Sequence, residues 1–198
     1  MERCAKDELS LWDLATTYEQ EFDTAVPEEF PSLPFCKDLR GLYYQQGLSY
    51  CENFKGYPDQ KILEVEASFV IPIDDWLFNG IIDLLYIDEQ GRLVVQDYKS
   101  KSSFKSKAEQ KEYARQLYLY SLYVKEKYGK FPELLRFSMF RKQKYTDIPF
   151  NTSDCEEALS WAKNTVSAIR NCWDFSPSCE DFYGNQLCNH REYCDYKI

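Results

Sequence analysis

The chain has 198 residues, of which 44% are hydrophobic and 29% are charged, and its formal net charge is −9. A chain of this length forms one domain that buries a core without help from disulfides or metal, and its hydrophobic content excludes a disordered protein. The negative charge argues against a protein that coats nucleic acid without specificity, although a local basic patch can still bind phosphates.

The N-terminal residues, MERCAKDELS, are charged from the start and lack the apolar stretch of a secretory signal. No apolar run approaches the roughly 18 residues that a membrane span requires, so no membrane partner is expected. We therefore expect a cytoplasmic protein whose eight cysteines are reduced.

Hydrophobic periodicity predicts the secondary structure. Four segments have apolar residues at helical spacing: 8–25, 36–54, 108–128 and 154–172. Four others alternate or form short apolar runs, as strands do: 62–73, 78–88, 92–100 and 134–141. A turn at 88–91 joins the second and third strands into a hairpin, and a long helix leads to the fourth strand. This order predicts an α/β fold with a mixed sheet of about four strands flanked by helices.

The same pattern divides the chain into three parts. Residues 1–60 form an N-terminal helical region, residues 61–172 contain all the strands, and residues 173–198 are a cysteine-rich C-terminal segment. The strands of the central part provide the rigid core on which a site can be built.

Three charged residues of the predicted hairpin are candidates for a site. Asp83 lies within an apolar strand, where a bare carboxylate is costly unless it is paired or binds metal. Asp97 and Lys99 are two residues apart on the next strand and share a face, so the hairpin brings them near Asp83. The alternative for a D-x-K pattern is an exposed salt bridge, which contributes little to stability.

Two carboxylates beside an ammonium group suit the metal-assisted hydrolysis of a phosphodiester. Carboxylate oxygens bind Mg²⁺ or Mn²⁺, and such a cation activates water and neutralises phosphate charge. The ammonium group stabilises charge in the transition state or helps to deprotonate the water.

The stretch GIIDLLYIDEQGRLVVQDYKS resembles the GxxD…(D/E)xK core of the PD-(D/E)XK nuclease superfamily, whose fold is restriction-endonuclease-like. The following QLYLY (116–120) resembles the Q-h-x-x-Y motif of its RecB-like exonuclease branch. The resemblance implies a divalent-metal-dependent nuclease, an exonuclease or an endonuclease with the exonuclease favoured, that acts on single-stranded or end-containing DNA. It also implies a role in recombination, repair, phage replication or CRISPR-type adaptation in a bacterial or phage-infected cell.

The resemblance implies roles for the hairpin residues. Asp83 and Asp97 become metal ligands, with the backbone carbonyl of Tyr98 as a third, and Lys99 becomes the catalytic lysine. Glu66, on the first strand, is a weaker candidate ligand, since its alternation with apolar residues is also that of an ordinary edge strand.

Two further residues come from the helix that follows the hairpin. The resemblance places Gln116 and Tyr120 beside the site, where they contact DNA or order the lysine. Their spacing of one helical turn puts them on one face. The alternative is a packed amphipathic helix with no role in the site.

The loop after the hairpin is a candidate basic patch on this acidic chain. It carries Lys101, Lys105 and Lys107, with Phe104 between them. Cations beside an exposed aromatic ring suit single-stranded DNA, in which phosphates and bases are both accessible. A solvated loop without a ligand is the alternative.

The C-terminal segment offers ligands for a second metal site. Iron–sulfur members of the family bind a 4Fe–4S cluster through one early and three late cysteines; here Cys179, Cys188 and Cys194 are candidates. With His190 they also make a candidate zinc set. Free cysteines that pack a C-terminal tail are the third interpretation.

One departure from the family keeps a second function open. RecB-like nucleases carry a histidine ligand near the start of the domain, whereas the one histidine here is His190. We therefore expect this sequence to lack the family's first motif, which leaves the site one ligand short. The alternative function is a catalytically degenerate nuclease fold that binds DNA or a protein partner.

Overall fold

The computed structural model describes residues 1–27, 36–174, 188, 193 and 194. Its centre is a five-stranded sheet with the strand order β1-β2-β3-β4-β5. The strands are β1 (Lys61–Ile73), β2 (Trp76–Ile87), β3 (Leu93–Lys99), β4 (Leu134–Met139) and β5 (Lys144–Pro149). β3 and β4 run parallel, and every other neighbouring pair is antiparallel. The mixed sheet confirms the predicted fold class, with five strands in place of about four.

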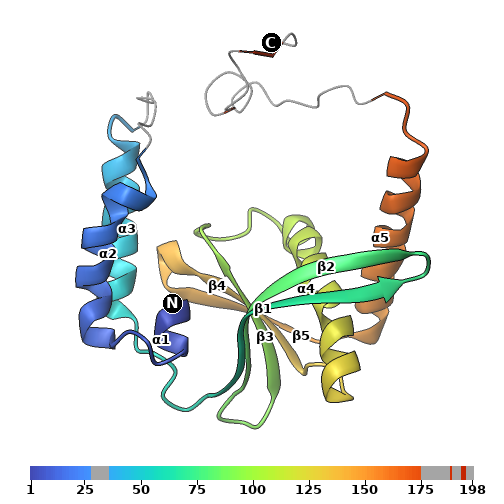
Figure 1. The fold of residues 1–198 in the computed structure, drawn as a ribbon, viewed down its shortest axis with the longest axis horizontal. Helices are drawn as coiled ribbons and strands as arrows, with labels where there is room; N and C mark the ends of the chain where they lie inside the picture. Colours follow the sequence, from blue (N-terminus) through green and yellow to red (C-terminus); the bar gives the residue numbers. More distant parts are fainter. Residues whose placement is uncertain (28–35, 175–187, 189–192, 195–198) are drawn as a thin grey trace.

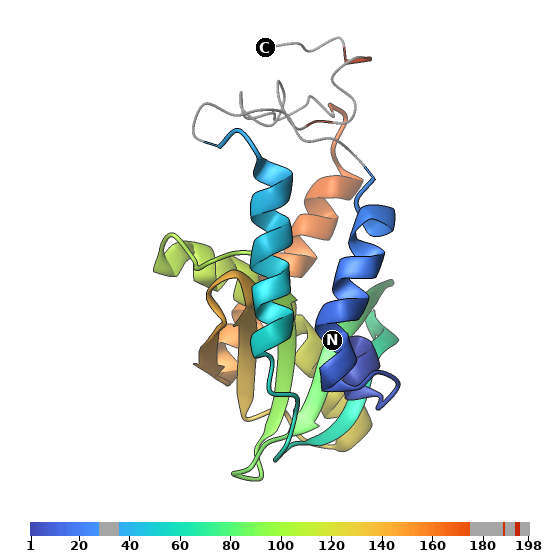
Figure 2. The ribbon, with the colours of Figure 1, turned by 90° about the vertical axis from the view of Figure 1, so that its left-hand side faces the viewer.

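The helices are α1 (Glu2–Ala5), α2 (Leu11–Ala25), α3 (Leu39–Asn53), α4 (Lys107–Tyr128) and α5 (Thr152–Arg170), and a 3₁₀ turn, η1, covers Phe140–Lys142. α4 makes the crossover between the parallel strands β3 and β4, as a parallel pair requires. It packs on one face of the sheet with α5 beside it, whereas α2 and α3 stand together at the other end of the sheet (Figures 1 and 2).

The main core lies between the sheet and α4. Its most buried side chains come from alternate positions of the central strands and from one side of α4: Ile82, Leu85, Val95, Leu117, Val124, Leu135 and Phe137. α4 begins at Ser106, whose hydroxyl accepts a hydrogen bond from the Glu109 amide. It ends at Gly129, whose φ of 74° is readily adopted by glycine. This long, well-capped helix holds its residues at fixed positions over the ends of β1 to β4.

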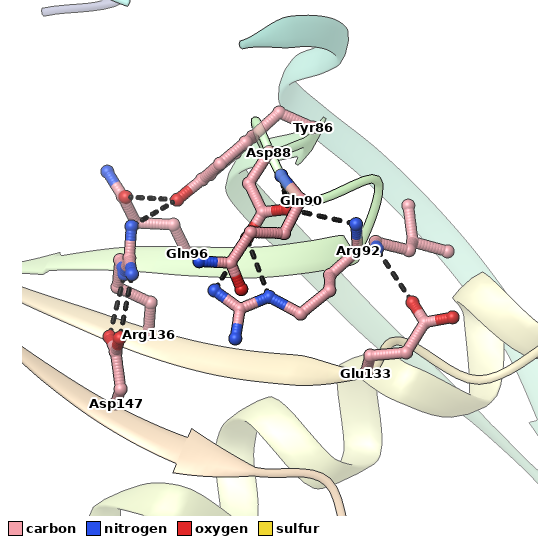
Figure 3. Close-up of polar contacts among 9 residues, drawn as sticks. Tyr86, Asp88, Gln90, Arg92, Gln96, Glu133, Arg136 and Asp147 are labelled. Atoms are coloured by element: carbon pink, nitrogen blue, oxygen red, sulfur yellow. Dashed lines mark hydrogen bonds and ion pairs between the residues drawn. The ribbon is translucent and has the colours of Figure 1, made fainter. Parts of the chain in front are cut away.

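The opposite face of the sheet carries a polar network (Figure 3). Tyr86 of β2 donates a hydrogen bond to Gln96 and accepts one from Arg136, whose guanidinium makes two further bonds to Asp147 of β5. At the hairpin turn, Asp88 accepts hydrogen bonds from the backbone amides of Gln90 and Arg92 and from the Arg92 side chain. These contacts fix the register of the four strands β2 to β5.

None of the helices in the described part of the chain is long and apolar enough to cross a membrane.

Candidate active site

The site lies where the ladder between β2 and β3 ends. The last residue pair in that ladder is Leu84 with Gln96, so Asp83 and Asp97 lie one position beyond it. The amide of Tyr98 then donates a hydrogen bond of 2.7 Å to Oδ2 of Asp83. The Asp83 side chain thus replaces a strand partner for β3, which holds its carboxylate beside the D-Y-K segment.

Asp97 and Lys99 lie on the α4 face of β3, as their spacing predicts. The Asp97 residue is only 4% exposed, and the ammonium nitrogen of Lys99 lies 2.8 Å from its Oδ2. Apart from this ion pair, Oδ2 has no polar partner in the described part of the chain. A carboxylate oxygen has more than one lone pair, so Oδ2 can bind a cation while it stays beside Lys99.

Both carboxyl groups have raised pKa values. Burial raises the pKa of Asp97 to about 6 against the opposing effect of Lys99, and repulsion from Asp83 adds to the rise. Burial also raises the pKa of Asp83, although the Tyr98 amide and the Lys99 charge act to lower it. Two such carboxyl groups favour a divalent cation between them, since the cation removes both the repulsion and part of the desolvation cost.

Lys99 is held by groups from two other elements. Its ammonium nitrogen donates a hydrogen bond of 3.1 Å to Oε1 of Gln116 on α4. It also lies 5.5 Å from the ring centroid of Tyr113 and 5.8 Å from that of Phe137. The Gln116 amide in turn donates to the hydroxyl of Tyr120 at 2.6 Å. The predicted residues Lys99, Gln116 and Tyr120 therefore form one continuous chain of contacts.

Gly80, the glycine of the G-x-x-D motif, has a packing role. A Cβ atom at this position would lie 2.3 Å from the ring of Phe69 and 2.9 Å from the ring of Tyr120. Phe69 is itself buried and stacked on Tyr123 at 4.5 Å, so it has little room to move. The absence of a side chain at Gly80 lets α4 approach β2 closely enough to place Tyr120 near the site.

Val65 pairs with Leu84 and Ala67 pairs with Ile82, so Glu66 of β1 lies opposite Asp83 of β2. Its φ of 49° is in the left-handed region, which is strained for a residue other than glycine. Burial and the charge of Asp83 raise its pKa. A cavity of about 300 Å³ is lined by Glu66, Asp83, Tyr98 and the N-terminal residue Glu2.

The residues present fit a divalent cation with few protein ligands. The open Oδ2 atom of Asp97 and the adjacent carboxylate of Asp83 are hard oxygen donors, which Mg²⁺ and Mn²⁺ prefer. Within the described residues, no group of three histidine, cysteine, aspartate or glutamate side chains converges to hold a metal ion. Mg²⁺ commonly binds through one or two carboxylates and keeps several waters, so two carboxylates suffice.

The predicted basic loop is partly folded into the protein. Lys101 pairs with Glu109 at 2.5 Å and lies 4.5 Å from the Tyr113 ring centroid. Phe104 packs on Tyr113 and on Phe137, at centroid distances of 5.3 and 5.1 Å. Lys105 and Lys107 have exposed side chains. The loop thus presents two of its three lysines to solvent and turns its aromatic ring toward the core.

The structure describes two of the four predicted C-terminal metal ligands. Cys179 and His190 lie outside the described residues. Cys188 and Cys194 are half-buried free thiols.

Two aromatic residues beside Lys99 are not identifiable from motif spacing alone. Phe137 is in register with Asp97 on the parallel strand β4, and Tyr113 lies one helical turn before Gln116 on α4. Phe137 could be found only from the register in which β3 pairs with β4. Tyr113 could be found from its place one helical turn before Gln116, once Gln116 is taken as a site residue.

Comparison with known proteins identifies the family. A family model described as the PD-(D/E)XK nuclease superfamily matches residues 5–198. A solved structure entitled "Crystal structure of SSO0001" is 17% identical with a TM-score of 0.38, and the match covers 96% of this chain and 86% of that chain. No curated protein matches. The family model spans nearly the whole sequence, and the chain belongs to the PD-(D/E)XK nuclease superfamily.

Proposed function

We propose that this chain is a divalent-metal-dependent deoxyribonuclease, an exonuclease of the RecB-like type. Its superfamily consists of nucleases, which generally use Mg²⁺ or Mn²⁺, and the fold implies DNA as the substrate. The observation that carries the proposal is the chain of contacts from the buried Asp97 through Lys99 and Gln116 to Tyr120. A salt bridge that only stabilised the fold would not require the further contacts from Lys99 through Gln116 to Tyr120.

The proposed chemistry assigns a role to each group. Asp83, Asp97 and the backbone carbonyl of Tyr98 would hold the cation, which would act as a Lewis acid to activate water and neutralise phosphate charge. Lys99 places its ammonium group beside the two carboxylates, where it stabilises negative charge on the phosphate in the transition state. The rings of Tyr113 and Phe137 shield this ammonium from water, which strengthens its field at the site.

Gln116 and Tyr120 are positioning residues in this proposal. Gln116 accepts a hydrogen bond from Lys99 and donates one to Tyr120, so it fixes the direction of the lysine side chain. Glu66 is a further candidate ligand because its strained backbone holds it beside Asp83.

The RecB-like assignment rests on the resemblance of QLYLY (116–120) to the motif of that branch. With it come the preference for single-stranded or end-containing DNA and a place in recombination, repair, phage replication or CRISPR-type adaptation. The cytoplasm of a bacterial or phage-infected cell is part of the same proposal, as is the assignment of residues 61–172 to the nuclease core.

A second candidate function is a nuclease fold that binds DNA or a protein partner without cutting. One observation favours it: the described residues include no convergent group of three side chains of the metal-binding types. The iron–sulfur and zinc interpretations of the C-terminal segment are compatible with either function.

End-labelled single-stranded and double-stranded DNA, incubated with Mg²⁺ or Mn²⁺, tests the proposal. We expect metal-dependent cutting that Lys99→Ala abolishes and that Lys111→Ala leaves unchanged, because Lys111 forms only an exposed pair with Glu157. Absence of cutting by folded protein with either metal would refute the nuclease and favour the binding protein. Cutting that survives Lys99→Ala would place the chemistry elsewhere.

A further inference from the structure

Two arginines near the site differ from all the others in the described part of the chain. Of the seven arginines described there, five form ion pairs with carboxylates: Arg3, Arg40, Arg92, Arg136 and Arg170. Figure 3 shows two of these pairs, at Arg92 and Arg136. Arg115 and Arg141 form none with the described residues, and the Nε atom of each is buried without a hydrogen-bond partner there. In a chain of net charge −9, such unpaired guanidinium groups are conspicuous.

Arg115 lies on one side of the site. It directly precedes Gln116 on α4, and its guanidinium lies 4.9 Å from the ring centroid of Trp161 on α5. Trp161 is 42% exposed. Arg115, Trp161, Gln116 and Tyr120 line a common cavity of about 440 Å³. An unpaired cation and an exposed indole ring therefore open onto the same cavity as the residues that hold Lys99.

Arg141 lies on the other side. It belongs to η1, two residues after Met139, and Met139 is in register with Lys99 on the neighbouring strand. Its guanidinium lies 4.4 Å from the ring centroid of Tyr43 on α3. Arg141 and Tyr43 line a cavity of about 750 Å³ together with Tyr98 and Ser100, the residues on either side of Lys99. Arg115 on α4 thus stacks against α5 and Arg141 on η1 stacks against α3, and these two helices stand at opposite ends of the sheet (Figure 1).

The chemistry of these groups selects a phosphate ligand. A guanidinium group presents several donors in a planar fork that matches two oxygens of a phosphate. Stacking on an aromatic ring fixes the plane of that fork while leaving the outer donors free. Aromatic rings beside a line of cations also offer faces on which unpaired bases stack.

We propose that Arg115 and Arg141 each bind a backbone phosphate of one DNA strand, on either side of the metal site. Trp161 supplies a stacking platform for a base next to Arg115. The strand then runs from the α4–α5 cavity across the end of β3 to the cavity beside α3. This inference rests on the proposed nuclease function and adds the path that the DNA strand takes across the site.

The test is the affinity of the full chain for a fluorescein-labelled oligothymidylate, measured by anisotropy over a salt series with Ca²⁺ in place of Mg²⁺. We expect Arg115→Ala and Arg141→Ala each to weaken binding about tenfold. Each variant should also reduce the slope of log K against log salt by about 0.7, the value for one phosphate of a single strand. Arg170→Ala is the matched control, since its partner Asp75 lies on the exposed β1–β2 turn, and it should bind as the wild type does.

Substitutions of Trp161 should change the affinity for the oligonucleotide but not its salt dependence, unlike those of the two arginines. Trp161→Leu should weaken binding roughly tenfold without changing the salt slope, and Trp161→Phe should restore most of the loss, because stacking needs a ring and no charge. Thermal melting of each variant checks that it is folded, and Arg115→Lys, which retains the charge, gives a second measure at that position.

A small substrate separates this inference from the proposed function. Bis(p-nitrophenyl) phosphate is too small to span from the metal site to either arginine, so both arginine variants should lose much more of their DNA cutting than of their hydrolysis of this substrate. If the wild type cuts DNA while both arginine variants bind oligothymidylate normally, or if only double-stranded DNA binds, the proposed path is wrong and the nuclease stands. If the wild type hydrolyses neither substrate, the nuclease itself fails. Binding of an acidic peptide in preference to oligothymidylate would also overturn the path.

Discussion

The ammonium nitrogen of Lys99 lies 2.8 Å from Oδ2 of Asp97, and that oxygen has no hydrogen-bond partner in the described part of the chain. Asp97 is buried and Lys99 is half-buried, with side-chain exposures of 6% and 18%. Burying two charges carries a desolvation cost that attraction repays only when hydrogen bonds satisfy both groups. Lys99 also donates to Gln116, but Asp97 depends on this one contact, which does not fully offset its burial, and its pKa is therefore raised.

Asp97→Asn should therefore stabilise the protein when no metal is present. Because burial raises the pKa of Asp97 to about 6, the ionised carboxylate destabilises the fold at pH 7, and a neutral amide removes that penalty. We expect the free energy of unfolding in EDTA to rise by roughly 1–3 kcal/mol, while cutting is lost. Urea unfolding at pH 7 measures the first effect.

Asp147→Asn is the control for this prediction. Its carboxylate accepts two hydrogen bonds of 2.7 Å from Arg136 (Figure 3), so its replacement should lower stability and leave cutting intact. If Asp97→Asn destabilises the protein as Asp147→Asn does, Asp97 is an ordinary structural partner of Lys99.

Gly80→Ala should disturb the site through packing. The added methyl group meets the buried ring of Phe69 at 2.3 Å and the ring of Tyr120 at 2.9 Å. Overpacking of this kind costs about 1–3 kcal/mol, and displacement of Tyr120 should also slow cutting. Thermal melting and cutting rates of the variant measure the two effects.

Gly91→Ala separates these effects from simple loss of stability. It strains a turn with a φ of 77° but meets no atom within 4 Å, so it should destabilise the protein and leave cutting unchanged in the folded fraction. Equal loss of activity per folded molecule in both variants would remove the packing role assigned to Gly80.

Gln116→Ala should reduce kcat more than it changes KM. The substitution removes the acceptor of the 3.1 Å bond from Lys99 and so releases the lysine side chain, without removing a ligand for the metal. We expect about a tenfold fall in kcat, less than the roughly hundredfold cost of a misplaced catalytic group, because Asp97 still holds the ammonium group. Tyr120→Phe removes only the hydroxyl that Gln116 contacts and should have a smaller effect of the same kind. A fall that appears only in KM would make Gln116 a DNA contact instead, and Glu126→Ala, exposed on the same helix, is the control.

The regular spacing of apolar residues along the sequence explains why most of the fold was predictable. Strands β1 to β4 and helices α2 to α5 follow from apolar spacing, and the end of α4 follows from Gly129. β5 (Lys144–Pro149) was not predicted, because KYTDIP has little hydrophobic pattern and exposes most of its side chains. Its conformation depends on pairing with β4, which local sequence does not encode.

The candidate site was predictable where two-residue alternation fixes a face, as for Asp97 and Lys99. Contacts made by tertiary folding were not. Phe104 sits in a lysine-rich loop that predicts an exposed ring, but the loop folds back so that the ring packs on Phe137. The left-handed backbone of Glu66 likewise has no signal in an alternating strand. Arg115 and Arg141 could not be separated from five paired arginines without their neighbours.

Glu64 gives a pH-dependent prediction away from the metal site. Its side chain, 13% exposed, accepts hydrogen bonds from Tyr123, Lys127 and Tyr128 and so ties β1 to α4. Burial acts to raise its pKa, but these bonds together outweigh it and hold the pKa below its usual value. Because the folded protein binds this proton less tightly than the unfolded chain, the stabilisation is present at neutral pH. It is lost as the pH falls through the folded pKa.

Glu64→Gln should therefore lower the free energy of unfolding by roughly 1–2 kcal/mol at pH 7, since charge-assisted hydrogen bonds become neutral ones. The difference from the wild type should shrink as the pH falls through the lowered pKa of Glu64, where Glu64 itself becomes protonated. Glu157→Gln, which breaks only the half-exposed pair with Lys111, should cost less than about 0.5 kcal/mol at either pH. Urea unfolding of the three proteins at pH 7 and pH 3.5 measures this. If Glu64→Gln lowers the free energy of unfolding by the same amount at both pH values, then packing and not the charge of Glu64 stabilises the contact between β1 and α4.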